Sequence, residues 1–153
     1  MSKYLLDTNI CIFFFKGRFK LDEKFIEVGV DNCFISEITL AELKFGAENS
    51  ANPEKHRKIV QEFQNKIQVI PIFNSINLYA KEKARLRKLG TPIDEFDLLI
   101  GVTSIENALT LVTNNTKHFE RLNGINIEDF PANMPHKVSK PKPPAHSPGV
   151  FNF

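Results

Sequence analysis

The sequence predicts an α/β/α sandwich built on a central, mainly parallel sheet of four to five strands, and three observations point to this fold. Short runs rich in β-branched and aromatic residues alternate with longer helical segments along residues 1–130. The strand-like runs have only three to six residues, and no internal repeat is present. Strands that alternate with helices in this way form parallel sheets whose two faces are covered by the helices.

The first half of the chain is expected to hold two strands and three helices. Residues 4–7 (YLLD) are typical of a buried strand, and helices over 9–16 and 22–29 follow it. Residues 32–36 (NCFIS) are expected to form the second strand. This strand leads into helix 37–48, in which a glutamate of the first turn complements the helix dipole.

The second half continues the alternation. Pro53 opens a helix, because proline at the first helical position loses no hydrogen bond. Gly90 ends the next helix, as glycine commonly does. The expected elements are helices 53–66, 74–89 and 97–108 and strands 67–72 (IQVIPI), 110–113 (TLVT) and 125–127 (INI).

By composition the chain divides into a folded domain over residues 1–130 and a proline-rich tail over residues 131–153. Six of the nine prolines lie in the tail, which has little periodic apolar pattern, so we expect it to be disordered. The tail also holds three lysines and no acidic residue, whereas the other 17 basic and all 18 acidic residues lie in the domain. The domain is therefore near −1 in charge, and any binding of nucleic acid must depend on local cations.

Several classes of protein are disfavoured by the composition. The longest apolar run, Ile10 to Phe15, is far shorter than the roughly 20 residues of a membrane span, and the N-terminus lacks a signal-peptide pattern. The expected location is cytoplasmic. Cys11 and Cys33 have neither the spacing of a zinc site nor that of a disulfide framework, so we expect buried, reduced thiols.

Two acidic residues attract attention in the first half, because ligands bind beyond the carboxyl ends of parallel strands. Asp7 ends the first strand and could simply cap the following helix, although Thr8 and Asn9 could serve that helix start and leave Asp7 free. Glu42 falls on or beside an apparent inward stripe formed by Ile38, Ala41 and Phe45, so it is either a boundary glutamate that reaches solvent or a residue that needs a cation.

Two further features lie in the second half. Asp94 and Asp97 stand three residues apart before an apolar helix, and capping explains only one of them. Gly101 follows Asp97 at helical spacing, which suggests close packing of the backbone there. Asn115 follows the fourth strand, although an ordinary polar turn would look the same.

We expect four residues at one edge of the sheet, namely Asp7, Glu42, Asp97 and Asn115. Each residue alone has an ordinary explanation, but helix capping does not predict that all four lie together. Three converging carboxylates repel one another and need a counter-charge. Ligands that are all oxygen favour a hard divalent ion, Mg²⁺ or Mn²⁺. Such an ion activates a water molecule and neutralises charge on a phosphodiester during hydrolysis.

Four separated blocks carry a specific resemblance to a known family. The blocks are YLLDTNICI, ISEITLAELKFGA, GTPIDEFDLLIGVTSIENALTLVTNNTKHFERL and INIEDF. From about residue 2 to 130 they resemble the PIN-domain ribonucleases and, within them, the VapC toxins of bacterial type II toxin–antitoxin pairs. The tail has no counterpart in that pattern.

This resemblance implies a PIN-like fold and a Mg²⁺- or Mn²⁺-dependent endoribonuclease, often homodimeric, which a cognate antitoxin holds inactive. It implies that Asp7 and Asp97 are metal ligands and that Glu42 is the second acid of the site. Asn115 matches a position that is often aspartate in the family, and Glu120 is the alternative acid in this region. The alternative function is a catalytically silent PIN-like module that binds RNA or protein.

A third interpretation, from a different class, is a receiver-like domain that accepts a phosphoryl group on an acidic cluster. Such a domain needs an acidic pair after its first strand and a lysine after its fifth, and this sequence has neither.

Two surfaces are candidates for binding. Lys81, Arg85 and Lys88 share a helix face at i, i+4 and i+7 and could contact an RNA backbone, although charged runs are usually just solvated. The adjacent phenylalanines at 13–15 cannot all face one direction on a helix, so they either meet a partner such as the antitoxin or pack against the helix at 22–29.

Overall fold

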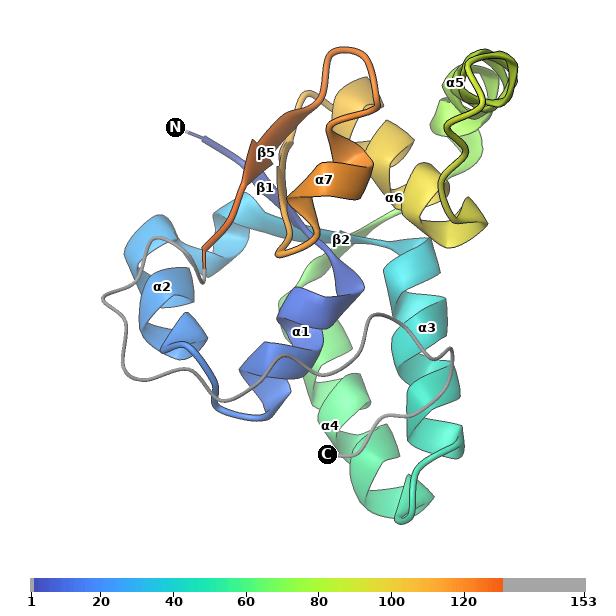
Figure 1. Cartoon of the computed structure of the whole chain (residues 1–153). Coiled ribbons are helices and arrows are strands. Elements are labelled where there is room, and N and C mark those ends of the chain that lie inside the picture. The colour runs from blue at the N-terminus through green and yellow to red at the C-terminus, as the bar shows by residue number, and fades with distance from the viewer. Residues whose placement is uncertain (1, 131–153) are drawn as a thin grey trace.

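The computed structural model describes residues 2–130, which form a five-stranded sheet between two layers of helices (Figure 1). The strand order is β3-β2-β1-β4-β5, and every neighbouring pair is parallel. The strands are β1 (Tyr4–Leu6), β2 (Cys33–Ser36), β3 (Gln68–Ile70), β4 (Thr110–Val112) and β5 (Asn126–Glu128). The predicted fold class is confirmed, with the upper number of strands.

Seven α-helices are found in the described part of the chain. They are α1 (Thr8–Phe15), α2 (Leu21–Val28), α3 (Glu37–Glu48), α4 (Pro53–Lys66), α5 (Ile76–Lys88), α6 (Glu95–Glu106) and α7 (Thr116–Phe119). Single 3₁₀ turns, η1 (Val30–Asn32) and η2 (Phe73–Ser75), precede β2 and α5. Most bounds lie within two residues of those predicted, whereas α7 is additional, because four residues are too few to show a helical period.

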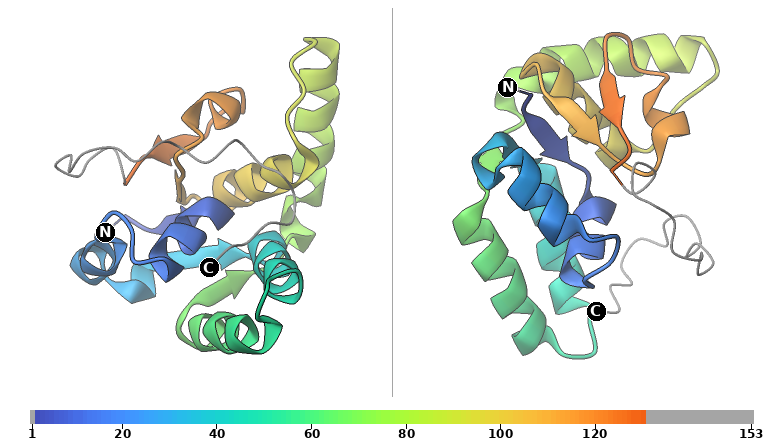
Figure 2. Two further views of the ribbon diagram at one scale, coloured as in Figure 1. Left: turned by 60° about the horizontal axis from the view of Figure 1, so that its bottom comes forward. Right: turned by 90° about the vertical axis from the view of Figure 1, so that its left-hand side faces the viewer.

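Each face of the sheet supports its own hydrophobic core, and the strands alternate between the two. In β1, Leu5 belongs to one core and Leu6 to the other, and in β4 Leu111 and Val112 divide in the same way. Helices α1 to α4 cover the Leu6 face, and α5 to α7 cover the Leu5 face, as the views in Figures 1 and 2 also show. All four leucine and valine side chains are fully buried, which explains why these short strands are apolar throughout.

The phenylalanines at the end of α1 pack within the molecule. The ring centroid of Phe14 lies 5.1 Å from that of Phe25 in α2 and 5.9 Å from that of Phe63 in α4. The Phe15 ring meets Phe63 edge to face at 5.1 Å, and Phe13 is buried. Of the two alternatives drawn from the sequence, the structure therefore has the intramolecular one, with contacts to α4 as well as to α2.

The inward stripe predicted for α3 is wrong. Ala41 and Phe45 are exposed, and the buried face instead carries Thr39, Leu43 and Ala47. Helix α3 packs against α4 on one side and the sheet on another, which turns its buried face away from the predicted one. Glu42 still lies next to that buried face and is half-buried.

The close packing predicted at Gly101 is confirmed. A methyl group added there would overlap the side chain of Leu122 and press on Phe119, so only glycine lets α6 approach α7 this closely. Both cysteines are buried and free, and burial raises the pKa of each thiol. The tail at residues 131–153 lies outside the described residues. Across residues 2–130, none of the helices has the length and apolar character needed to cross a bilayer.

Candidate active site

The strand order places a ligand site between β1 and β4. The chain leaves β1 through α1 on one face of the sheet and leaves β4 through α7 on the other, so the connections diverge at this point. The backbone N–H of Asp7 donates to the carbonyl oxygen of Val112 at 2.9 Å, which keeps the two strand ends side by side. Side chains that follow these two strands therefore meet at one edge.

Asp7 is the first of these side chains, and its two carboxylate oxygens serve different elements. Oδ1 accepts from the backbone N–H of Thr8 at 2.8 Å and so caps α1. Oδ2 accepts from the hydroxyl of Thr113 at 2.8 Å, immediately after β4. The expectation that Thr8 and Asn9 would serve the helix start and leave Asp7 free is wrong, because Asp7 is itself the cap while it faces β4.

Thr8 brings the second acid to the first. Its hydroxyl donates to Glu42 Oε1 at 2.8 Å and lies 3.1 Å from the hydroxyl of Thr39. Thr8 and Thr39 are buried, so these contacts are shielded from water. As a result, a residue directly after Asp7 fixes the carboxylate of α3 beside the carboxyl end of β1.

Asp94 precedes α6 and Asp97 lies in its first turn, and the two divide the roles as the sequence suggested they must. Asp94 is exposed and caps the helix, accepting from the backbone N–H of Phe96 at 3.2 Å. Asp97 is only 4% exposed. The pKa of Asp97 is raised to about 8, chiefly by burial and also by the negative charges of Asp7, Asp94 and Glu42. The three predicted carboxylates are therefore close enough to affect one another's ionisation.

Asn115 opens α7 and contacts the site from the β4 side. Its backbone N–H donates to the hydroxyl of Thr113 at 3.0 Å, while its side-chain Nδ2 lies 2.9 Å from Nδ1 of His118. The same His118 nitrogen lies 3.9 Å from Asp97 Oδ2. A chain of contacts thus runs from Asp7 through Thr113, Asn115 and His118 to Asp97.

Three residues of this network were not predicted from the sequence, namely Thr8, Thr113 and His118. The threonines were visible only as polar residues after strands, a position they share with ordinary turn residues. His118 gave no signal, because a single histidine within a short helix has no characteristic spacing.

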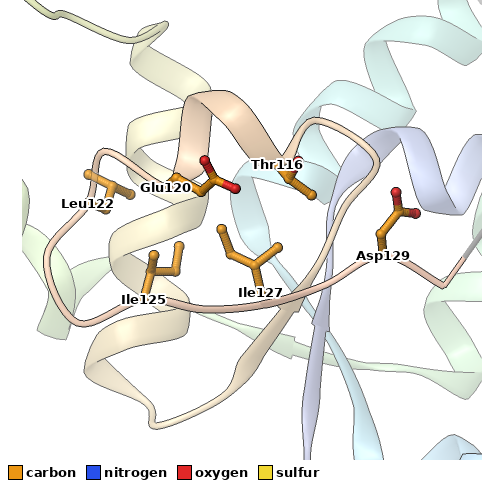
Figure 3. A pocket seen from close by; sticks show the side chains of 6 residues that line it. All are labelled: Thr116, Glu120, Leu122, Ile125, Ile127 and Asp129. Carbon is orange, nitrogen blue, oxygen red and sulfur yellow. The ribbon is translucent and has the colours of Figure 1, made fainter. Parts of the chain in front are cut away.

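Glu120, the alternative acid, lies outside the network. It is exposed and lines a hollow of about 360 Å³ between α7 and β5, together with Thr116, Leu122, Ile125, Ile127 and Asp129 (Figure 3). None of the three clustered carboxylates lines that hollow. The basic stripe on α5 is also altered, since Arg85 forms an ion pair with the buried Glu82 at 2.6 Å and leaves Lys81 and Lys88 as its exposed cations.

The residues of the site fit a hard divalent cation by their chemistry. Carboxylate and amide oxygens are the donors that Mg²⁺ and Mn²⁺ prefer. The raised pKa of Asp97 reflects a surplus of negative charge that a cation would offset. Within residues 2–130, however, no three histidine, cysteine, aspartate or glutamate side chains stand close enough together to enclose an ion without some movement. The carboxylates are gathered but would have to draw together to bind one.

Comparison with known proteins relates the whole described domain to one family. Residues 4–125 match the PIN domain. Over 131 residues the chain is 35% identical to the tRNA(fMet)-specific endonuclease VapC of Salmonella typhimurium, a match that covers 85% of this chain and 99% of the relative. It is 33% identical over 132 residues to the ribonuclease VapC2 of Haemophilus influenzae, with coverages of 85% and 99%.

Solved structures agree with the sequence relatives. The DNA-bound VapBC structure from Salmonella typhimurium superimposes with a TM-score of 0.78 at 36% identity, covering 85% of this chain and 99% of that one. VapBC-1 from nontypeable Haemophilus influenzae gives a TM-score of 0.76 at 31% identity, with coverages of 84% and 98%. Both likenesses extend over the sheet and both helical layers, since they cover nearly all of the described residues.

Proposed function

Because the chain belongs to the PIN-domain family, and within it to the VapC ribonucleases, we propose that it is the toxin of a type II toxin–antitoxin pair and hydrolyses RNA phosphodiester bonds with the help of a divalent metal ion. One observation carries the proposal from family to site. Asp97 is buried, and its pKa is raised by the charges of Asp7 and Glu42. The three carboxylates come from three separate segments of the chain. A structural cap needs no such convergence, whereas a cation site does.

Asp7 and Asp97 are the proposed ligands of the ion, which is Mg²⁺ or, alternatively, Mn²⁺. When bound, the ion lowers the pKa of a water molecule and neutralises charge on the scissile phosphate. Glu42 is half-buried and is positioned by Thr8, so its carboxylate can accept the proton of the attacking water. Asn115 carries no charge, and its amide can donate to a phosphate oxygen without repelling it.

The test replaces Asp97 by asparagine and uses the neighbouring Asp94 as the matched control. Asp97→Asn keeps the side-chain shape but removes the charge, so RNA cleavage should fall by at least about 100-fold. Asp94→Asn should cleave at close to the wild-type rate, because asparagine also caps helices well. The first RNA to test as a substrate is tRNA(fMet), because the Salmonella relative is named as specific for it.

Cleavage should also stop when a chelator is added and return with Mg²⁺ or Mn²⁺. Circular dichroism of each variant separates loss of chemistry from loss of fold. Wild-type cleavage by Asp97→Asn, or cleavage that is insensitive to the chelator, would show that the chain does not use this site. No cleavage by the wild-type chain on any RNA, together with retained binding, would favour the silent module.

We further propose that a cognate antitoxin binds this chain, because the matched solved structures are VapBC complexes. The α2 region offers an apolar surface for such a partner, with Ile26 77% exposed and Phe19 and Val30 also exposed. A second exposed apolar group, Phe73, Ile76 and Phe96, lies at the starts of α5 and α6 and would suit a homodimer. Co-purification with the product of a neighbouring gene tests the first idea, and light scattering of the isolated chain tests the second.

A further inference from the structure

His118 is the one imidazole that the described structure brings to the carboxylates. It lies in α7, its side chain is 46% exposed, and Nδ1 is 3.9 Å from Asp97 Oδ2. Among the described residues, His118 is the cationic type of side chain that lies beside the Asp97 carboxylate. An exposed ring beside a buried carboxylate is open to an ion that arrives from solvent.

The same ring nitrogen also contacts Asn115. Nδ1 of His118 lies 2.9 Å from the side-chain amide nitrogen of Asn115. In the tautomer that carries its hydrogen on Nε2, Nδ1 accepts from this amide with its lone pair. That lone pair is the group with which histidine binds metals.

The separation of the two atoms is compatible with a shared ion. Divalent ions hold nitrogen and oxygen ligands at about 2.1 Å, so two atoms on the same ion are at most about 4.2 Å apart. The 3.9 Å between Nδ1 and Oδ2 lies inside this limit. The ion would replace the amide hydrogen of Asn115 as the group that Nδ1 contacts.

We propose that His118 supplies a nitrogen ligand to the divalent ion beside Asp97 and so shifts the preference of this chain from Mg²⁺ toward Mn²⁺. Imidazole binds transition metals well, whereas Mg²⁺ favours oxygen ligands and sheds its waters reluctantly. The ligands expected from the sequence were all oxygen atoms, and His118 adds a nitrogen to that set. This inference rests on the proposed metal-dependent function. Its test can contradict the role of His118 while the proposed function still stands.

The experiment measures the ion itself, with full-length protein in the absence of RNA. Pulsed electron paramagnetic resonance of bound Mn²⁺ should detect coupling to a ligand ¹⁴N nucleus in the wild-type chain. His118→Gln should lose that coupling, and its Kd for Mn²⁺ should rise about tenfold or more, while its Kd for Mg²⁺ should change less than about twofold. Because His118 lies at the surface, circular dichroism should show an unchanged fold.

Two control variants test whether the nitrogen coupling comes from the imidazole of His118. Lys117→Gln changes the neighbouring exposed residue of α7 and should retain the nitrogen coupling. A His136→Gln and His146→Gln double variant removes the histidines of the tail and should retain it as well. Coupling that disappears in either control would assign the nitrogen elsewhere and overturn the proposal.

The remaining outcomes separate the two proposals. Bound Mn²⁺ without nitrogen coupling in the wild-type chain overturns the role of His118, and continued metal-dependent cleavage of RNA would then leave the proposed function standing. Coupling that persists in His118→Gln likewise overturns this role. If the wild-type chain binds neither ion, both proposals fail together.

Discussion

At the scale of single residues, the site is held together by hydroxyl groups as much as by its carboxylates. Thr113 is fully buried, and its one hydroxyl donates to Asp7 and accepts the backbone N–H of Asn115. Thr113 therefore fixes the position of the Asp7 carboxylate relative to the backbone of Asn115 at the start of α7. Thr8 does the same for Glu42 on the other side of Asp7. In the proposed reaction these two threonines would position the carboxylates of Asp7 and Glu42.

Removing the Thr113 hydroxyl should weaken both the fold and the reaction. Thr113→Val keeps the shape of the side chain but leaves the partly buried N–H of Asn115 without its acceptor, which should cost about 1–3 kcal/mol of unfolding free energy. Cleavage should fall about 10- to 100-fold, because the carboxylate of Asp7 is no longer oriented. Urea unfolding and cleavage rates measure the two effects. Thr113→Ser, which retains the hydroxyl, should come close to wild type in both, and equal losses in the two variants would contradict this role.

The raised pKa of Asp97 should make the metal-free protein less stable as the pH rises. In the folded chain this pKa is about 8, because of burial and the charges of Asp7, Asp94 and Glu42, whereas an unfolded aspartate has a pKa of about 3.9. Between these values the folded state holds a proton that the unfolded state has lost, so the free energy of unfolding falls with increasing pH. From pH 6 to 8 the expected loss is about 2 kcal/mol.

Urea unfolding in the presence of a chelator, at pH 6 and pH 8, measures this slope. Asp97→Asn should largely remove it and should be more stable than wild type at pH 8. His118 Nδ1 lies 3.9 Å from Asp97, so His118→Gln serves as a control that should keep most of the slope. A wild-type stability that is level or rises across the window would show that Asp97 is not held in its neutral form.

The residues that could be predicted from the sequence were those with an unusual position in a pattern. Asp7 interrupts an apolar strand and Asp97 precedes an apolar helix, so each carboxylate stood out against its neighbours. Thr113 and His118 did not, because threonine is common in turns and a single histidine has no period. Their roles depend on contacts across 106 residues in one case and on the placement of α7 in the other. Such contacts exist only after folding.

At the scale of elements, α5 illustrates how a surface helix is attached by a buried charge. Glu82 is buried and accepts from Arg85 at 3.1 and 2.6 Å and from the backbone N–H of Asn123 at 3.3 Å. Arg85 also donates to the carbonyl oxygen of Arg121 at 2.6 Å. Helix α5 is thereby fixed to the segment that follows α7. The helix could be predicted from the sequence, but Arg85 was expected in a basic stripe that either contacts RNA or is solvated. The pairing with a buried Glu82 leaves no signal in the apolar pattern.

Replacing Glu82 should destabilise the protein far more than replacing its neighbour in the chain. Glu82→Ala leaves Arg85 partly buried without its carboxylate and should cost about 3 kcal/mol. Lys83→Ala removes a surface ion pair with Glu95, whose two side chains are each 48% exposed, and should cost less than about 1 kcal/mol. Thermal or urea unfolding of the two variants provides the comparison. Similar losses in both would mean that the buried pair contributes no more than the exposed one.

At the scale of the whole molecule, the order of the strands explains why the site can form. β1 lies at the centre of the sheet with β4 on one side and β2 on the other, so Asp7, Thr113 and the start of α3 meet at a single edge. Alternating elements were enough to predict the parallel sheet and the edge at which ligands bind. The strand order itself was not predicted, because short apolar strands do not reveal which neighbour each one pairs with.

A divalent ion should therefore stabilise the entire fold, since its proposed ligands come from the first strand and the sixth helix. At an ion concentration of about 100 times Kd, the free energy of unfolding should rise by about 2.7 kcal/mol. Asp7→Asn should abolish most of this gain. Thermal unfolding with Mn²⁺, against the same ionic strength of a monovalent salt, makes the measurement. A similar gain from the monovalent salt would indicate general screening rather than a site.

The position of β4 in the sheet also has a consequence for when the activity first exists. Synthesis proceeds from the N-terminus, and the strand that completes the centre of the sheet beside β1 is the fourth of the five to be made. Asp7 is among the earliest residues to be synthesised, yet it gains Asp97 and Thr113 as neighbours only after most of the domain has left the ribosome. A nascent chain, or one released early by truncated messenger RNA, carries Asp7 without Asp97 and Thr113. The proposed nuclease would thus be harmless to the ribosome that makes it until synthesis is nearly complete.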